Sequence, residues 1–350
     1  MRELRHSILS RTFCLLVSVN LMTASARLRR DPSRKRKRSL AAERVFQVSC
    51  VPPLADGKAP LRLYIRMCFH EYYEAVVAEL ARGQYYVTVC GTPGIGTSYF
   101  YVYLLHRFRA EHPSTTIVTA SYTACSVMKK CVVFRPGCFE GVEHRSVPDE
   151  EGDVVYLYDG APTAPTPHRV RMVCFVSALG GWIYGLRKTG FHSAIYMPLW
   201  SQDELLEAAT DLGLPLAPHV IRDRFHWFGG VPKTVLQGNR QMVKGIRQSI
   251  VRCLSRVTST EQLMQFLRSI PDSPTRASLC VFHLHPEPEC GANAFFAYRL
   301  GFPSRAIADA LAWGITDTKN ARQLRICLNS EATPDVVLWL DAIMSSRSGR

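Results

Sequence analysis

A glycine loop within residues 85–98 constrains the fold of this chain more than any other feature. The run Tyr-Tyr-Val-Thr-Val-Cys, which is strand-like, leads into the loop, and residues 99–110 follow with helical spacing. The loop matches the pattern G-x-x-x-x-G-K-[ST] at Gly91, Gly96 and Ser98. A strand, a glycine loop and a helix in this order are the setting that a phosphate-binding loop requires. The sequence therefore predicts a strand–loop–helix unit able to hold phosphate groups.

Thr97 stands where this pattern has a lysine. The backbone N–H groups of such a loop and the positive end of the helix can hold phosphates without it. The ammonium group that would reach the β- and γ-phosphates is missing. The loop therefore indicates nucleotide-binding ancestry more than present ATP hydrolysis, with ATP bound weakly or not at all. The expected nucleotide-binding residues are Gly91, Thr92, Pro93, Gly94, Ile95, Gly96, Thr97 and Ser98.

Asp159 ends an apolar, strand-like run at residues 154–158. In proteins with a phosphate-binding loop, an acid at this place helps to hold Mg²⁺, and the loop serine supplies a hydroxyl ligand. Ser98 and Asp159 are therefore the expected Mg²⁺ ligands. The alternative is an ordinary turn residue at a strand end. Because Gly160 follows, no second acid stands there to orient an attacking water.

Two cations, Arg224 and Lys233, flank a Phe-Gly-Gly-Val-Pro segment. In a nucleotide-binding fold such cations can sense or stabilise a γ-phosphate. We therefore count both, together with Asp159, as candidate catalytic residues. The alternative interpretation is that they are surface charges at a helix end.

A second cluster contains His283, His285, Glu287, Glu289 and Cys290. A His-x-His pair on a strand places both rings on one face, which permits metal binding. We favour instead an exposed strand edge that runs into a proline-rich turn.

Strand-like and helical runs alternate across residues 85–237, which predicts an α/β fold with a parallel sheet and helices on both faces. Residues 61–81 have roughly helical spacing and are expected to form a helix before the loop. Ser201 is expected to cap another helix, with Glu204 completing a capping box. Beyond Gly238 the expected helices cover 240–255, 259–269, 303–313 and 334–345, around one strand at 279–285.

The chain has 350 residues, of which 47% are hydrophobic, so it can bury the cores of two or three domains. Its 12 cysteines include no Cys-x-x-Cys, which favours a body built for a reducing compartment. The expected division is a signal peptide at 1–26, a basic arm at 27–45, a phosphate-loop domain at 46–237 and a mainly helical domain at 238–350.

The amino-terminal residues 1–26 have the layout of a secretory signal peptide. Arginines precede an apolar stretch at residues 12–22, and Ala-Ser-Ala closes the segment at 24–26. We expect no membrane contact after cleavage. The alternatives are a buried amphipathic helix and a translation start assigned too far upstream.

A basic block at Arg34–Arg38 follows, and it is typical of a nuclear localisation signal that binds importin or of a polyanion-binding arm. The alternative is a solvated linker. Residues 1–40 hold eleven basic residues against Glu3 and Asp31, a net charge of +9 out of +14, which leaves +5 for residues 41–350. The folded body is therefore not expected to be strongly basic.

Several segments occur in an order known from one protein family. They resemble, in turn, a helix before a phosphate-binding loop, the loop with its helix, a second acidic motif and two long, unusual motifs of Crinkler effectors of oomycetes and fungi. The retrotransposon hot spot proteins of trypanosomes are similar. The segments are Leu63–Phe69 with Tyr72-Tyr73, Thr88–Leu105, Leu157–Gly160, Tyr196–Leu205 and Arg224–Leu236, and the likeness covers about residues 60–237.

The resemblance implies a P-loop NTPase domain of the AAA/STAND type in a secreted effector. Such effectors act inside host cells, often in the nucleus, on host nuclear protein or DNA. This chain departs from the family pattern at Thr97 and at residues 177–181, and it has no Leu-Phe-Leu-Ala-Lys-type translocation motif. Two alternatives stay open: an active Mg²⁺-dependent ATPase with a cation from elsewhere in the fold, and an intracellular protein in which residues 12–23 belong to the core.

Overall fold

The computed structural model describes the glycine loop, the sheet that carries it and most of the helices that follow. The predicted signal peptide, the block Arg34–Arg38 and the predicted helix at 334–345 lie outside the described residues, as do Glu287, Glu289 and Cys290. The described residues are 45–48, 61–123, 125–138, 140–163, 170–176, 181–187, 189–259, 261–263, 265, 281–286 and 298–314.

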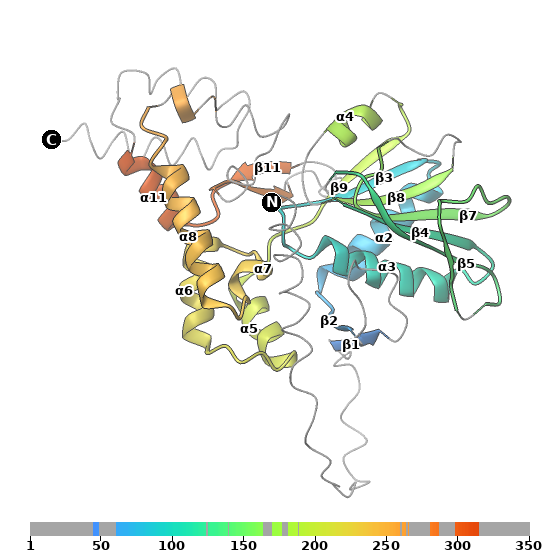
Figure 1. Ribbon diagram of the computed structural model, residues 1–350, viewed down its shortest axis with the longest axis horizontal. Coiled ribbons are helices and arrows are strands. Elements are labelled where there is room, and N and C mark those ends of the chain that lie inside the picture. The colour runs from blue at the N-terminus through green and yellow to red at the C-terminus, as the bar shows by residue number, and fades with distance from the viewer. Residues whose placement is uncertain are drawn as a thin grey trace, which may run out of the picture.

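A seven-stranded sheet with the order β6-β5-β4-β7-β8-β3-β9 forms the centre of the fold (Figure 1). The five strands from β4 to β9 in that order are parallel, while β5 and β6 extend the sheet by antiparallel pairing. The strands are β3 (Tyr86–Cys90), β4 (Thr116–Tyr122), β5 (Met128–Phe134), β6 (Val142–His144), β7 (Val154–Asp159), β8 (Arg171–Val176) and β9 (His192–Tyr196).

The predicted parallel sheet includes two strands, β5 and β6, that pair antiparallel. Only residues 123–127 separate β4 from β5. A connection this short can join only antiparallel strands, because a parallel pair needs a crossover of a dozen residues or more. The α/β class and a mostly parallel sheet are confirmed.

Helices α3 (Thr97–Glu111) and α4 (Gly181–Arg187) lie on opposite faces of the sheet, with α4 above it and α3 below it in Figure 1. The crossover through α3 runs from β3 towards β4, and the crossover through α4 runs from β8 across β3 to β9. Since parallel crossovers are right-handed, two that run in opposite directions must use opposite faces. Helix α2 (Cys68–Ala81) packs beside α3, with Phe69 and Phe100 in ring contact.

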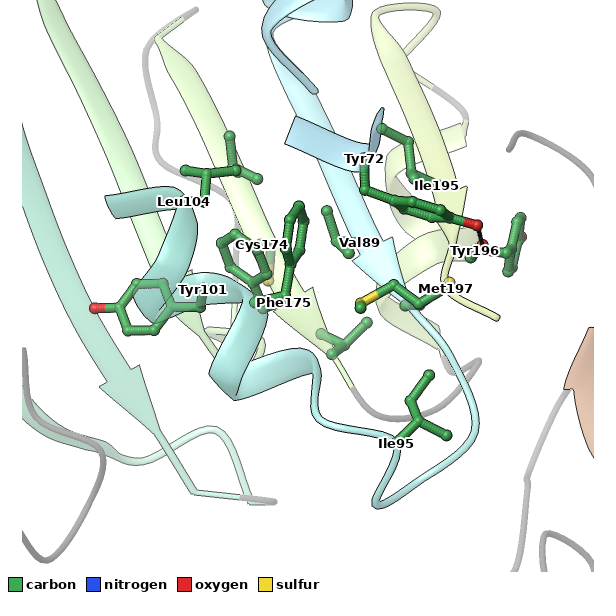
Figure 2. Close-up of a cluster of buried hydrophobic side chains, with 14 of the residues drawn as sticks. Tyr72, Val89, Ile95, Tyr101, Leu104, Cys174, Phe175, Ile195, Tyr196 and Met197 are labelled. Carbon is green, nitrogen blue, oxygen red and sulfur yellow. Dashed lines mark hydrogen bonds between the residues drawn. The ribbon is translucent and has the colours of Figure 1, made fainter. Parts of the chain in front are cut away.

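The core lies between the sheet and these helices. All five residues of β3 are buried, because both faces of a central parallel strand are covered. Phe175 on β8 packs against Phe100 and Tyr101 of α3, and Figure 2 shows part of this cluster. Each such buried side chain contributes about 1.5–3 kcal/mol by leaving water. Cys90 and Cys174 are buried within it, as small apolar residues would be.

The helix predicted over residues 61–81 is wrong in its first part. Residues Leu61–Tyr64 form strand β2, which pairs antiparallel with β1 (Val45–Val48), and helix α2 begins only at Cys68. Leu63 and Tyr64 are buried, and the Tyr64 hydroxyl donates to Glu207 at 2.9 Å. These tertiary contacts decide the local structure, since short apolar runs fit a helix or a strand equally well.

Helices dominate the described residues after β9. Ser201 caps α5 by accepting from the Glu204 N–H at 3.1 Å, but the Glu204 side chain bonds Arg66, so only half of the predicted capping box forms. The paired strands β10 and β11 also belong to this part. The elements are α5 (Gln202–Asp211), α6 (Pro218–Phe228), α7 (Pro232–Val235), α8 (Arg240–Leu254), β10 (His283–Pro286), β11 (Tyr298–Gly301) and α11 (Arg305–Gly314).

Candidate functional site

The glycine loop leaves β3 at Cys90 and enters α3 at Thr97, as the sequence predicts. Gly94 and Gly96 have φ angles of 92° and 102°, a left-handed conformation that side chains other than glycine rarely adopt. Gly96 is the residue before the helix, and its carbonyl accepts from the N–H groups of Tyr99 and Phe100, whereas the N–H groups of Thr97 and Ser98 have no acceptor within α3. The loop therefore ends in backbone donors at the positive end of a helix, which favours an anion.

Trp200 is hydrogen-bonded to the glycine loop. Its Nε1–H donates to the Ile95 carbonyl at 2.8 Å. Arg66, which is 3% exposed, makes a two-point ion pair with Glu204 at 2.7 and 3.0 Å and donates to the two carbonyls just before Trp200. Its guanidinium also lies 4.8 Å from the centroid of the Trp200 ring. The sequence analysis did not identify Arg66 or Trp200 as site residues, although Trp200 lies within one of the two unusual motifs.

Figure 2 shows Ile95 on the loop, with its side chain directed back towards the sheet. Ile95 is fully buried, and a Cβ atom on Gly91 would lie only 2.3 Å from its Cδ1 atom. Packing against Ile95 therefore favours a glycine at position 91, whereas backbone conformation favours glycine at positions 94 and 96.

Lys233 lies beside the loop. Its backbone N–H donates to the Gly94 carbonyl at 3.2 Å, and a Cβ atom on Gly94 would lie 2.8 Å from the Lys233 Cβ. The lysine side chain is exposed. Gly230, in the same segment, lies close to the backbone of Trp200, because a Cβ there would lie 2.1 Å from the Trp200 carbonyl oxygen. The second unusual motif thus brings a cation to the glycine loop.

Arg224, unlike Lys233, is bonded to backbone carbonyls outside the glycine loop. It is buried, and its Nη1 donates to the Val235 carbonyl at 3.0 Å and to the Gln237 carbonyl. Burial lowers the pKa of this guanidinium, and nearby Arg240 lowers it further. Arg224 therefore fastens α6 to the end of α7. The phosphate contact that the sequence suggests for it stays a prediction.

Ser98, in the first turn of α3, is in contact with Asp159 at the end of β7. The Ser98 hydroxyl donates to Asp159 Oδ1 at 2.8 Å. Asp159 is registered with Phe175 on β8, which packs on α3, and residues paired across a sheet point to the same face. Burial raises the pKa of the Asp159 carboxyl, while the Ser98 hydrogen bond and the charge of Lys129 act in the opposite direction.

The Ser98–Asp159 pair is chemically suited to Mg²⁺, which prefers hard oxygen ligands. Ser121 is registered with Asp159 on the neighbouring strand, and its buried hydroxyl has no hydrogen-bond partner among the described residues. No group of three His, Cys, Asp or Glu side chains comes together in the described part of the chain. Mg²⁺ here would therefore take few protein ligands and would need phosphate or water oxygens to complete its shell.

Lys129 is a residue that sequence reasoning missed. It is the extra residue of a β-bulge, since Ser121 pairs with Lys130 but Tyr122 pairs with Met128. Bulges redirect side chains and are frequent beside functional sites. The exposed Lys129 is close enough to Asp159 to lower the pKa of that carboxyl.

Strand β10, which carries His283 and His285, contacts the loop. Thr92 accepts a hydrogen bond from the Leu284 N–H at 2.8 Å, and Leu284 separates the two histidines. His283 is 3% exposed, so the predicted exposed strand edge is wrong at this residue. Burial, with the charge of His285 as a lesser cause, lowers the pKa of His283 to about 3.

Sequence comparison identifies relatives for part of the chain. It is 33% identical over 160 residues to Crinkler effector protein 15 and to Crinkler effector protein 16 of Phytophthora infestans. This chain is similar to Crinkler effector proteins. The match covers 43% of this chain but 25% and 24% of the two relatives, so the chain spans about a quarter of their length. No family model matches. The likeness to retrotransposon hot spot proteins stays a prediction.

No helix among the described residues is both long enough and apolar enough to cross a membrane.

Proposed function

We propose that this chain is a Crinkler-like effector whose α/β domain binds a nucleoside triphosphate, ATP in the first instance, together with Mg²⁺. The observation that carries the proposal is the 2.8 Å hydrogen bond between Ser98 and Asp159, in the first turn of the helix that follows the left-handed Gly96. This pair would hold Mg²⁺, which would screen the phosphate charge, while the backbone N–H groups of Gly91–Ser98 bind the phosphates.

The position of the loop in the sheet supports a nucleotide site of the P-loop type. The crossovers that leave β3 and β8 run in opposite directions, and these two strands are neighbours. In open α/β sheets, ligands bind outside the carboxyl ends of strands at such a switch point. The loop after β3 lies at that place.

Two lysines are candidates for the missing charge of the loop. Thr97 is 7% exposed and carries no charge, whereas Lys233 contacts Gly94 through its backbone and Lys129 lies near Asp159. We assign the phosphate contact to Lys233 first, because it comes from a segment already bonded to the loop. Neither lysine supplies the base that would orient an attacking water, so we propose binding in preference to turnover.

We propose that the protein acts in the nucleus of a host cell. The signal-like residues 1–26 and the basic block Arg34–Arg38 support secretion followed by importin-dependent entry into a host nucleus, where host protein or DNA would be the partner. A mature protein that begins near Arg27 in culture medium is the expected result. A protein that retains residue 1 and stays in the producing cell would favour the intracellular alternative.

Equilibrium binding of a fluorescent ATP analogue to the full chain tests the site. We expect binding that requires Mg²⁺ and is lost in Asp159→Ala and Ser98→Ala, because each variant removes an oxygen ligand. Glu151→Ala is the matched control, since Glu151 is an exposed acid before the amino end of β7. Absence of binding at high analogue concentration, or equal loss in the control, would overturn the proposal.

The lysine assignment has its own test. Lys233→Gln is expected to weaken binding about tenfold or more, since a charge-assisted hydrogen bond contributes about 1.5–3 kcal/mol. Lys244→Gln on α8 is the control, and Thr97→Lys is expected to offset part of the loss. A larger effect of Lys129→Gln would transfer the role to Lys129. Phosphate release that depends on either lysine would favour the active ATPase.

A further inference from the structure

The positive charge of the folded body is concentrated in one segment. Residues 41–350 carry a net charge of +5. Residues 218–256 alone hold eight basic residues against Asp223, a net charge of +7, so the rest of the body is slightly acidic. The overall balance therefore conceals a local basic region, which comprises helices α6, α7 and α8.

Most of this charge lies on the exposed face of α8. Its basic residues and the one just after it are exposed, and no acid occurs between Asp223 and Glu261. Ile250 and Leu254 are buried on the opposite face. In the described part of the chain none of these cations has a carboxylate partner in ion-pair contact. We call this surface the α8 basic face; its residues are Arg240, Lys244, Arg247, Arg252 and Arg256.

The α8 basic face extends along the helix axis, and a ring contact holds one of its cations in place. At 1.5 Å per residue, Arg240 and Arg256 are about 24 Å apart along the axis. Arg240, Lys244 and Arg247 share one stripe, because residues three and four apart are neighbours on a helix. The Arg247 guanidinium lies 3.8 Å from the centroid of the Trp227 ring on α6, a contact that orients the cation.

We propose that the α8 basic face binds the phosphate backbone of duplex nucleic acid, at a site separate from the glycine loop. The proposal does not depend on nucleotide binding at that loop. Arginine is the commonest cation on the face, and its planar fork suits phosphate oxygens. The stripe Arg240, Lys244 and Arg247 extends about 10 Å along α8, and the five cations together extend over about 24 Å, so the face offers several contacts to a duplex, which carries one negative charge about every 1.7 Å.

An acidic protein is the alternative partner, and the observations favour it less. Protein interfaces are usually centred on large apolar or aromatic anchors. The exposed residues of α8 include one large apolar side chain, Val251, and the neighbouring Trp227 is engaged by Arg247. Binding through charge alone, without an apolar centre, is typical of contacts with a nucleic-acid backbone.

The test uses the full chain with Arg34–Arg38 changed to glutamine, so that the basic arm does not mask the face. Anisotropy of a labelled DNA duplex is measured over a salt series. The triple variant Arg240→Gln/Lys244→Gln/Arg247→Gln is expected to bind at least tenfold more weakly. The slope of log affinity against log salt should fall by about 2.7, since each phosphate contact contributes about 0.9.

The control removes equal charge elsewhere, in Arg82→Gln/Arg135→Gln/Arg145→Gln, and should leave affinity and slope unchanged. Equal losses in both triple variants, or no duplex binding by the parent protein, would overturn the proposal. Tighter binding of polyglutamate than of the duplex would favour the acidic protein instead. Unchanged ATP-analogue binding by the α8 variant, with an unchanged melting temperature, shows that any loss is confined to the face.

Discussion

The buried carboxyl of Asp159, a proposed Mg²⁺ ligand, carries a cost in stability. Burial raises the pKa of its carboxyl above the ordinary value of 3.8, and the Ser98 hydrogen bond offsets only part of this shift. The folded protein therefore holds the Asp159 proton more tightly than the unfolded chain does. Stability from this group is present at low pH and is lost as pH rises through the pKa that Asp159 has in the folded protein.

Asp159→Asn is accordingly expected to raise the melting temperature at neutral pH and to leave it unchanged below the ordinary carboxyl range. The amide keeps an oxygen that can accept from Ser98 but carries no charge to desolvate. Thermal unfolding of both proteins across pH measures the difference. A lower melting temperature for Asp159→Asn at neutral pH would contradict the expectation. The same variant should lose Mg²⁺-dependent nucleotide binding, as is common where function and stability conflict.

At the scale of elements, the segment after β9 acts as a support for the glycine loop. Arg66 bonds this segment at Glu204 and at two backbone carbonyls. Trp200, in the same segment, donates a hydrogen bond to the Ile95 carbonyl of the loop. Lys233, from α7, adds a backbone bond at Gly94. The two unusual motifs, Tyr196–Leu205 and Arg224–Leu236, thus meet at the same loop.

Trp200→Phe is expected to destabilise the protein by about 1–3 kcal/mol, because the Ile95 carbonyl loses its buried donor. Affinity for the ATP analogue should fall further than stability alone explains. Trp182→Phe is the matched control, since the buried Nε1 of Trp182 has no hydrogen-bond partner among the described residues. Chemical denaturation and analogue binding measure both effects. Equal effects of the two substitutions would show that ring volume, and not the hydrogen bond, supports the loop.

At the scale of the whole molecule, the glycine loop is bonded to a strand 192 residues away. Thr92 accepts from the Leu284 N–H at 2.8 Å, and Tyr196 of β9 contacts Tyr298 of β11 with ring centroids 4.7 Å apart. The loop and the β10–β11 pair are therefore mechanically connected. A change in one is expected to reach the other.

Thr92→Val tests this connection, because it keeps the shape of the side chain but leaves the Leu284 N–H without its acceptor. A loss of about 1–2 kcal/mol should speed trypsin cleavage at Arg299 and Arg305 about 5–30-fold. Thr210→Val is the control; its exposed hydroxyl donates only to a carbonyl of its own helix. Unchanged cleavage in Thr92→Val would mean that β10 is held by other contacts.

The local features of the site follow from the sequence, whereas its supports do not. The glycine spacing identified the loop, and the apolar run before Asp159 identified the strand end that meets it. Arg66, Lys129 and Leu284 carry no comparable signal. Each of them acts through a contact that depends on strand order, on a β-bulge or on a long-range hydrogen bond. The spacing of residues within a short stretch of sequence does not encode such contacts.

By itself the sequence determined the α/β class, the phosphate-loop pattern and the acid at the end of β7, because periodicity and glycine spacing are local properties. Only the tertiary structure decided that β5 runs antiparallel, that Leu61–Tyr64 is a strand and that Arg224 bonds backbone carbonyls. It also decided that the cations of α8 are exposed while Ile250 and Leu254 are buried, which a net charge cannot express. The reason is that burial and pairing are properties of the assembled chain, and they override weak local preferences.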